Sequence, residues 1–343
     1  MELSSTPMLW LQLAIAAAVI LGIAAQLTKS ADIIAFKTGL GRSFIGVVLL
    51  ATATSLPELG TGISSVTLIG GAAGANLAAG DAFGSNIFNL MIIGILDLLW
   101  RKGSIFQGLS SSPAIVGLLG ILVIGCAAVS IMVHNQADFM TSFSVSPMSI
   151  GLLLVFIVAL FAVFREGKEN DQADDNPDYS EKSLGIAFTI YGISAAIIVV
   201  TAIWLAQTGE SLAEAMHWDR SFVGTQFLAL STSLPELAAS IAALRIMAPE
   251  LAITNVLGSN LFNMGFVLFM DDVTYVDGAI WAILSPVHIV TASMAILMTV
   301  VVLVPIMGKS RLSFGRAVSM EAILLIGLYL VTSFLIFYLG DPH

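Results

Sequence analysis

Long apolar runs separated by short polar segments dominate this chain. Seven of these runs contain no Asp, Glu, Lys or Arg, and they cover residues 3–28, 104–137, 139–164, 183–209, 251–270, 278–308 and 322–340. Three further apolar runs are each interrupted by one acid, at Glu58, Asp81 and Glu236. Since a helix needs roughly 20 apolar residues to cross a bilayer, the pattern predicts an all-α polytopic membrane protein with ten transmembrane helices.

The composition supports this interpretation. The chain is 57% hydrophobic and only 10% charged, whereas soluble proteins devote about a quarter of their residues to charge. Residues 1–10 contain no Lys or Arg, so we expect the first apolar run to stay in the protein and not to be removed as a signal peptide. The surroundings of the chain are therefore the lipid bilayer, and we expect a multi-pass protein of the cell membrane.

The basic residues predict the orientation of the chain. Twelve of the thirteen Lys and Arg fall in segments that alternate on one side of the ten spans, and Arg220 alone falls on the other side. By the positive-inside rule, the first side is cytoplasmic and both termini face outward. The net charge of −10 is spread over both sides. It indicates no nucleic-acid partner, no obligate protein partner and no cofactor.

The chain contains the same pattern twice. A polar linker, residues 166–183, separates a first half at 1–165 from a second half at 184–343, with five spans in each. The second half repeats three motifs of the first: RSFIG at 42–46 returns as RSFVG at 220–224, TSLPEL at 54–59 returns unchanged at 232–237, and GSNIFN at 84–89 returns as GSNLFN at 258–263. The repeated regions extend over 42–97 and 220–271. Because five is odd, the second half enters the membrane from the opposite side, so the repeats are inverted.

Inverted repeats place the two glutamates of the motifs at the same depth. Glu58 lies 16 residues beyond Arg42, and Glu236 lies 16 beyond Arg220. At about 1.5 Å per helical residue, each glutamate lies roughly 24 Å inward, and the membrane with its headgroups is about 40–45 Å thick. The two carboxylates are therefore predicted to meet near the midplane, where secondary transporters with inverted repeats bind their substrates.

The residues around these glutamates favour a cation. No Lys or Arg lies at that depth to neutralise the acids, so a metal ion, Na⁺ or a proton must supply the positive charge. Neighbouring Thr, Ser and Asn residues add oxygen donors at helical spacing, and no His or Cys joins them, which suits hard ions such as Ca²⁺ and not Zn²⁺ or Cu⁺. The side-chain candidates are Glu58, Glu236, Thr54, Thr232, Ser55, Ser233, Ser85, Ser259, Asn89, Asn263 and Asp81.

Two prolines extend the set of oxygens to the main chain. Pro57 and Pro235 have no N–H, so the carbonyls of Ala53 and Ser231 lose their helical donors, and broken transmembrane helices use such carbonyls to bind cations. A helix kink with a hydrogen-bonded glutamate would explain one such motif. Two inverted copies at matched depth favour a binding site.

The paired motifs TSLPEL and GSN-x-FN resemble the α-repeats of the cation/calcium antiporter superfamily, in particular its sodium/calcium exchanger branch. The resemblance covers both halves. It implies that Glu58 and Glu236 ligate Ca²⁺ and Na⁺, that Thr54 and Thr232 contribute backbone oxygens, and that Ser55, Ser233, Ser85 and Ser259 serve Na⁺. It also implies a role for the backbone carbonyls of Ala51 and Ala229. Transport would proceed by alternating access driven by the sodium gradient, with the first and sixth spans sliding against the rest.

The chain departs from the family pattern at four positions. Ala53 and Ser231 stand where the family has glycine. Asn263 stands where members commonly have Asp, and Asp81 stands where they usually have Asn. Asp81 could therefore add a third acid to the central site. Two other acids in the repeats, Asp97 and Asp271, are interpreted as solvated acids at helix ends, with a role on the access path as the less favoured alternative.

We therefore predict a secondary active antiporter that exchanges Na⁺ for Ca²⁺. The alternative is a Ca²⁺/H⁺ or other divalent cation/H⁺ antiporter, which needs the same glutamates but fewer sodium-binding hydroxyls. An intramembrane hydrolase is disfavoured because the chain lacks a His-Glu-x-x-His helix and a second aspartate matching Asp81 in depth. Inverted repeats with broken helices favour a carrier over a channel. The prediction is of a transporter and not an enzyme.

Overall fold

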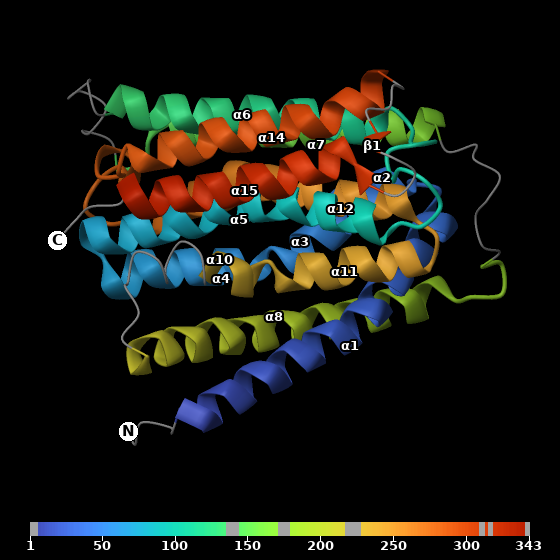
Figure 1. Ribbon diagram of the computed structural model, residues 1–343, viewed down its shortest axis with the longest axis horizontal. Helices are drawn as coiled ribbons and strands as arrows, with labels where there is room; N and C mark the ends of the chain where they lie inside the picture. Colours follow the sequence, from blue (N-terminus) through green and yellow to red (C-terminus); the bar gives the residue numbers. More distant parts are fainter. Residues whose placement is uncertain are drawn as a thin grey trace.

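The computed structural model describes residues 6–134, 144–170, 179–216, 228–308, 313–314 and 318–339. Apart from a hairpin of two short strands, β1 (Ser313–Phe314) and β2 (Val318–Ser319), the described residues form helices and their connections. Most of the long helices lie roughly side by side along the long axis of the molecule (Figure 1). The predicted all-α membrane architecture is confirmed.

The first half contains four long helices and one broken one. Its long helices are α1 (Thr6–Thr38), α5 (Gly71–Leu99), α6 (Ser112–His134) and α7 (Pro147–Asn170). The broken span runs through α2 (Arg42–Ile45), the π-helical segment η1 (Gly46–Leu50), α3 (Ala51–Thr54), α4 (Leu56–Ser64) and the π-helical segment η2 (Ser65–Ile69).

The second half follows the same order. It comprises α8 (Leu184–Ala215), α10 (Ala229–Thr232), α11 (Leu234–Arg245), α12 (Pro249–Phe262), the π-helical segment η5 (Asn263–Val267), α13 (Leu268–Thr274), the 3-10 turn η6 (Ile280–Ala282), α14 (Val287–Gly308) and α15 (Met320–Leu339). Residues 220–227 of the repeated region lie outside the described residues, as do Lys309, Arg311 and Arg316.

The helices are apolar on the outside as well as the inside. Within the described residues, nine helical stretches are long and apolar enough to cross a membrane. The tenth predicted span corresponds to α10 and α11, whose preceding residues are not described. Large apolar side chains such as Phe161, Val200 and Phe334 are more than 60% exposed. In water such a surface would aggregate, whereas in lipid it is the surface that a membrane helix needs.

Both central helices break at the serine of the TSLPEL motif. Ser55 separates α3 from α4 with φ −94° and ψ 5°, and Ser233 separates α10 from α11 with φ −85° and ψ 5°. Pro57 and Pro235 follow in the first turn of the next helix, where the missing N–H costs nothing. The repeat in sequence therefore produces the same break twice, and it opens the backbone beside each glutamate.

The broken helices pack against the helices that carry the second motif. α3 contacts α12, and α10 contacts α5. Gly258 of α12 permits one of these contacts, because a Cβ atom at this position would lie 2.8 Å from the Val47 Cα and 3.0 Å from the Ala51 Cβ. The glycine of the GSN-x-FN motif thus lets two backbones approach closely, as small residues commonly do between membrane helices.

We expect Gly258→Ala to destabilise the protein, because the added methyl meets backbone atoms that cannot move independently. Overpacking of this kind costs about 1–3 kcal/mol. Gly120→Ala in α6 is the matched control, since a Cβ atom there would meet nothing within 4 Å, and alanine favours the helix. Thermal unfolding of the detergent-solubilised variants measures both. Equal unfolding midpoints would contradict the packing argument.

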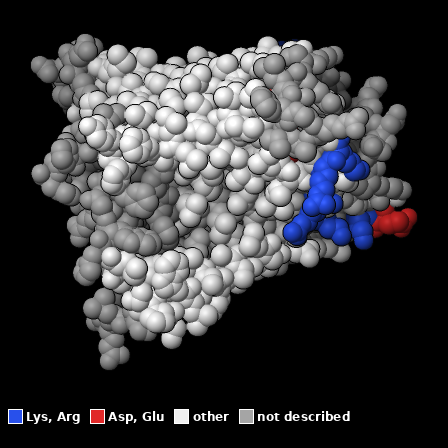
Figure 2. All heavy atoms as spheres, viewed as in Figure 1, with Lys and Arg blue, Asp and Glu red and all other residues white. Residues whose placement is uncertain are grey.

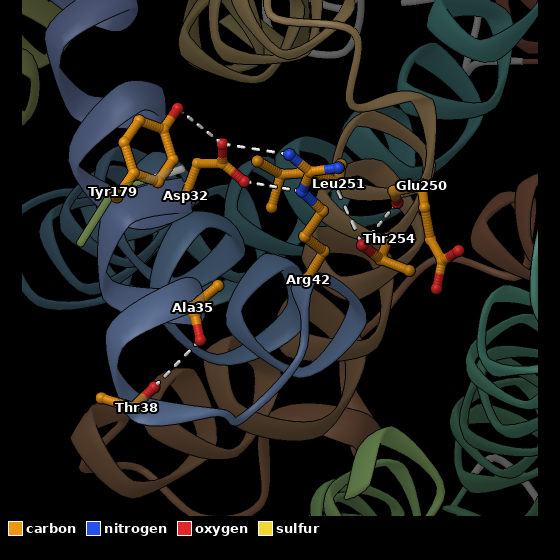
Figure 3. Close-up of polar contacts among 8 residues, drawn as sticks. All are labelled: Asp32, Ala35, Thr38, Arg42, Tyr179, Glu250, Leu251 and Thr254. Carbon is orange, nitrogen blue, oxygen red and sulfur yellow. Dashed lines mark hydrogen bonds and ion pairs between the residues drawn. The ribbon is translucent and has the colours of Figure 1, made fainter. Parts of the chain in front are cut away.

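The basic residues gather at one end of the molecule (Figure 2). We call this the basic end; it is where α1 ends and α8 begins, and the opposite end, where α4 and η2 end and α5 begins, is the far end. At the basic end the guanidinium of Arg42 donates to Asp32 of α1 at 2.7 and 3.2 Å, and the hydroxyl of Tyr179 donates to the same carboxylate at 3.0 Å (Figure 3). Burial and the neighbouring carboxylate raise the pKa of Tyr179 to about 12, so the phenol keeps its proton.

A second polar junction at the basic end joins α12 to the first half. Glu250 accepts hydrogen bonds from the hydroxyls of Ser43 and Ser110, the latter at 2.6 Å. Beside the Glu250 carboxylate, the hydroxyl of Thr254 donates to the main-chain carbonyl of Glu250 at 2.7 Å within α12 (Figure 3).

The helices α1 and α8 pack mainly against each other, along one side of the bundle (Figure 1).

Candidate functional site

All thirteen predicted site residues are buried near the crossing of the broken helices. Their relative exposures range from 0% to 2%. Those from the first half lie on α3, α4 and α5, and those from the second half lie on α10, α11, α12 and η5. The chain thus brings the two copies of each motif together in the interior, and in this conformation the site is closed to solvent.

The two glutamates are linked through serines of the opposite repeat. The Ser55 hydroxyl donates to Glu236 Oε1 at 2.9 Å, and the Ser233 hydroxyl donates to Glu58 Oε1 at 3.3 Å. Ser259 also donates to Glu236 Oε1, at 3.2 Å. This reciprocal pairing follows the inverted symmetry of the sequence, since the serine of each TSLPEL motif donates to the glutamate of the other motif.

Four buried oxygen atoms in this region have no hydrogen-bond partner, and they form two symmetry-related pairs. They are Oε2 of Glu58, Oε2 of Glu236, Oδ1 of Asn89 and Oδ1 of Asn263. All four are acceptors, and burial of an unpaired acceptor normally costs about 1–3 kcal/mol. Repetition of this cost at matched positions indicates that the four oxygens share a function that needs acceptors and excludes donors.

Two further asparagines orient these amides. Asn89 Nδ2 donates to Asn260 Oδ1 at 3.0 Å, and Asn263 Nδ2 donates to Asn86 Oδ1 at 3.5 Å. Asn260 in turn donates to the main-chain carbonyl of Asn86 at 3.1 Å. With the NH₂ groups occupied, the Oδ1 atoms of Asn89 and Asn263 are the ends left free. Asn86 and Asn260 are not among the residues predicted from the sequence, although both belong to the GSN-x-FN motif.

The remaining hydroxyls contact one another between the two repeats. Thr54 Oγ1 lies 3.5 Å from the Ser259 hydroxyl, and Thr232 Oγ1 lies 3.4 Å from the Ser85 hydroxyl. The threonines also contact the main-chain oxygens that the family resemblance singles out. The Ala51 carbonyl accepts from Ser55 N at 2.9 Å and from Thr54 Oγ1 at 3.2 Å. The Ala229 carbonyl accepts from Ser233 N and Thr232 Oγ1 in the same way, at 3.0 and 3.3 Å.

Asp81 joins this site from its side. Its Oδ1 atom accepts from Thr232 at 3.0 Å and its Oδ2 atom accepts from Thr61 at 2.5 Å. Its counterpart in the second half, Asn255, likewise accepts from Thr54, at 3.5 Å, and its NH₂ group donates to Ser240 at 3.1 Å. Asp81 therefore has one oxygen on the central hydroxyls and the other on α4, one turn beyond Glu58.

The interpretation of Asp97 and Asp271 as solvated acids is wrong. Asp97 is 6% exposed and Asp271 is fully buried. Asp97 accepts from Ile105 N at 2.8 Å and from the Ser319 hydroxyl, so it stabilises a connection at the basic end. Asp271 has no hydrogen-bond partner on either oxygen. Both side chains are buried because of the way the ends of the spans pack, and the hydropathy of the sequence does not reveal this packing.

The chemistry of the site is that of oxygen ligands around two carboxylates. Among the described residues, no group of three or more His, Cys, Asp and Glu side chains is placed to hold a metal ion together. A cation at the centre would therefore take its ligands from Glu58 and Glu236 and complete them with amide, hydroxyl and carbonyl oxygens. Such a set suits Na⁺ and Ca²⁺, which accept oxygen donors in flexible geometry.

Comparison with solved structures shows the same fold. The sodium–calcium exchanger NCX_Mj, in a structure soaked with 2.5 mM Na⁺ and 10 mM Sr²⁺, superimposes with a TM-score of 0.71 at 20% sequence identity, covering 95% of this chain and 98% of that one. A second structure of that exchanger, soaked with 10 mM Na⁺ and no Ca²⁺, gives a TM-score of 0.70 at 19% identity. The architecture of two inverted five-helix repeats is thereby confirmed.

Two relatives in sequence cover most of the chain. The inner membrane protein YrbG of Escherichia coli is 27% identical over 255 residues, which are 71% of this chain and 73% of that protein. The sodium/calcium exchanger MaX1 of Methanosarcina acetivorans is 26% identical over 276 residues, which are 72% and 77% of the two chains. The sequence profile of the family described as "Sodium/calcium exchanger protein" matches residues 8–166 and 186–338. This chain therefore belongs to the sodium/calcium exchanger protein family of membrane cation exchangers.

Proposed function

We propose that this chain is a secondary active antiporter that exchanges Na⁺ for Ca²⁺ by alternating access. The observation that carries the proposal is the set of four buried, unpartnered acceptor oxygens from Glu58, Glu236, Asn89 and Asn263. Two of them belong to carboxylates, which together balance one Ca²⁺. No donor satisfies the four oxygens, as expected of ligands whose partner is a cation.

The hydroxyls favour sodium as the counter-ion. Ser55 and Ser259 donate to Glu236 and Ser233 donates to Glu58, while Ser85 lies beside Thr232. Proton coupling alone would not need these hydroxyls. The relative MaX1 is named a sodium/calcium exchanger. The rival Ca²⁺/H⁺ mechanism gains its support from Asp81, because a third buried carboxylate beside the pair could take up a proton.

We further propose that the basic end faces the cytoplasm. Lys and Arg side chains gather at this end (Figure 2), and such residues are retained on the cytoplasmic side. The far end then faces outward, together with both termini. The linker 166–183 is cytoplasmic in this orientation, and its residues 171–178 lie outside the described part of the chain.

Ion flux in proteoliposomes tests the coupling. With Na⁺ inside and pH equal on both sides, we expect rapid Ca²⁺ uptake, and we expect none when a pH gradient is imposed without Na⁺. Ser55→Ala and Ser233→Ala should raise the Na⁺ concentration needed for half-maximal uptake more than they raise that for Ca²⁺. Uptake that follows the pH gradient alone would assign the chain to the proton-coupled alternative.

A further inference from the structure

Asp271 is an acid that the central site does not use. It lies in α13 near the far end, it is fully buried, and neither of its carboxylate oxygens has a hydrogen-bond partner. A carboxylate buried without a partner is costly by several kcal/mol. A structural role would provide donors, as Asp272 shows, since that neighbour accepts from Ser146 N, the Ser149 hydroxyl and Ile280 N at 2.6 to 2.8 Å.

The carboxyl group of Asp271 faces α4 beside Asp81. A Cβ atom on Gly62 would lie 2.5 Å from Asp271 Oδ1 and 3.0 Å from Oδ2, so only glycine leaves room for the group. The preceding residue, Thr61, donates to Asp81 Oδ2 at 2.5 Å. Asp81 and Asp271 therefore flank the same turn of α4, and Asp81 lies within electrostatic range of both Asp271 and Glu58.

The inverted copy of this arrangement, at the basic end, has different residues. At the offset of 178, Gly62 corresponds to Ser240, and Asp81 corresponds to Asn255 at the offset of 174. There the Asn255 amide donates to the Ser240 hydroxyl at 3.1 Å, and Ser240 donates to the Ala252 carbonyl at 3.3 Å. At these positions the basic end has a neutral, hydrogen-bonded pair, whereas the far end has two acids, one of which has no hydrogen-bond partner.

We propose that Asp81 and Asp271, with the Thr61 hydroxyl, form a second binding site for Ca²⁺ between the central site and the far end. Two carboxylates balance the charge of one divalent ion, and their oxygens are the ligands that Ca²⁺ prefers. The proposal goes beyond the transport function and does not depend on it, because a cation bound at Asp271 is detected by binding and not by flux.

Thermal unfolding of the detergent-solubilised full chain tests this site. The background is Glu58→Gln/Glu236→Gln, which removes both central carboxylates. In this background we expect CaCl₂ to raise the unfolding midpoint above that in choline chloride of the same ionic strength. Adding Asp271→Asn should abolish the rise and should itself raise the midpoint without Ca²⁺, because it replaces an acid that is costly to bury without a partner by a neutral side chain of the same shape.

The control is Asp277→Asn, which changes an exposed acid six residues away at the same end and should leave both values unchanged. Three results would overturn the proposal. A lower midpoint of Asp271→Asn without Ca²⁺ would show that a protein group, such as Arg220, which lies outside the described residues, satisfies the carboxylate. An equal rise in NaCl would show that the site does not select a divalent ion. A midpoint that depends on pH and not on Ca²⁺ would assign a proton to Asp271.

Discussion

Glu58→Gln and Glu236→Gln should each abolish Ca²⁺ flux while the protein stays folded. Each substitution removes one of the two charged ligands that we propose, and the loss of one partner from a buried charged contact costs about 3–5 kcal/mol, which corresponds to more than roughly 100-fold in affinity. The fold should persist because glutamine has the same shape and keeps an acceptor for Ser233 or Ser55. Uptake of Ca²⁺ into proteoliposomes and the thermal unfolding midpoint measure the two effects.

Glu181→Gln is the matched control for this prediction, because Glu181 is exposed in the connection before α8 and lies away from the site. It should transport at the wild-type rate. The assignment of the central site fails if either glutamate variant keeps more than a small part of the wild-type flux at saturating Ca²⁺. Loss of the folded protein in both variants would instead show that the carboxylates stabilise the ion-free structure.

Asn260→Ala should weaken both stability and Ca²⁺ binding. The substitution removes the acceptor of Asn89 Nδ2 and the donor to the Asn86 carbonyl, and each buried group left unpaired costs about 1–3 kcal/mol. The freed amide of Asn89 can then rotate, so its oxygen is no longer held in one orientation. We expect the unfolding midpoint to fall and the Ca²⁺ concentration for half-maximal uptake to rise by about tenfold, or 1.4 kcal/mol.

Asn76→Ala separates the two effects. Asn76 also makes several buried or half-buried contacts, to Ser285 N at 2.7 Å and to the Ile283 carbonyl at 3.2 Å, but none of them involves the central site. It should lower the unfolding midpoint and leave the Ca²⁺ dependence of uptake unchanged. If Asn260→Ala behaved in the same way, Asn260 would be a structural residue and not one that positions a ligand.

The sequence predicted the architecture because its two strongest signals are local. Apolar runs specify membrane spans one by one, and identical motifs specify the inverted repeat. The break at Ser55 and Ser233 also follows from local chemistry, since each serine precedes a proline by two residues. These features need no knowledge of how the helices pack.

The parts that escaped prediction depend on contacts between distant segments. Which end of an asparagine amide faces the site depends on its partner across the repeats, as for Asn89 with Asn260. The burial of Asp271 depends on the missing side chain of Gly62, some 200 residues earlier in the chain. Neither contact leaves a periodic trace in the sequence. The ligand roles of the thirteen candidate residues remain predictions that the flux and binding measurements address.

The contact of Asp32 with Arg42 and Tyr179 (Figure 3) holds α1 near its C-terminal end and leaves its N-terminal end without this restraint. The helix has 33 residues and is therefore about 50 Å long, and this contact fixes it near one extremity. Sliding of α1 along its axis would have to break the ion pair, whereas rotation about the fixed extremity would preserve it. The part of α1 from Thr6 to Asp32 is about 39 Å long, so each degree of such a rotation would displace its N-terminal end by about 0.7 Å. A rotation of a few degrees near Asp32 would therefore move the N-terminal end of α1, at the opposite face of the membrane, by several ångströms.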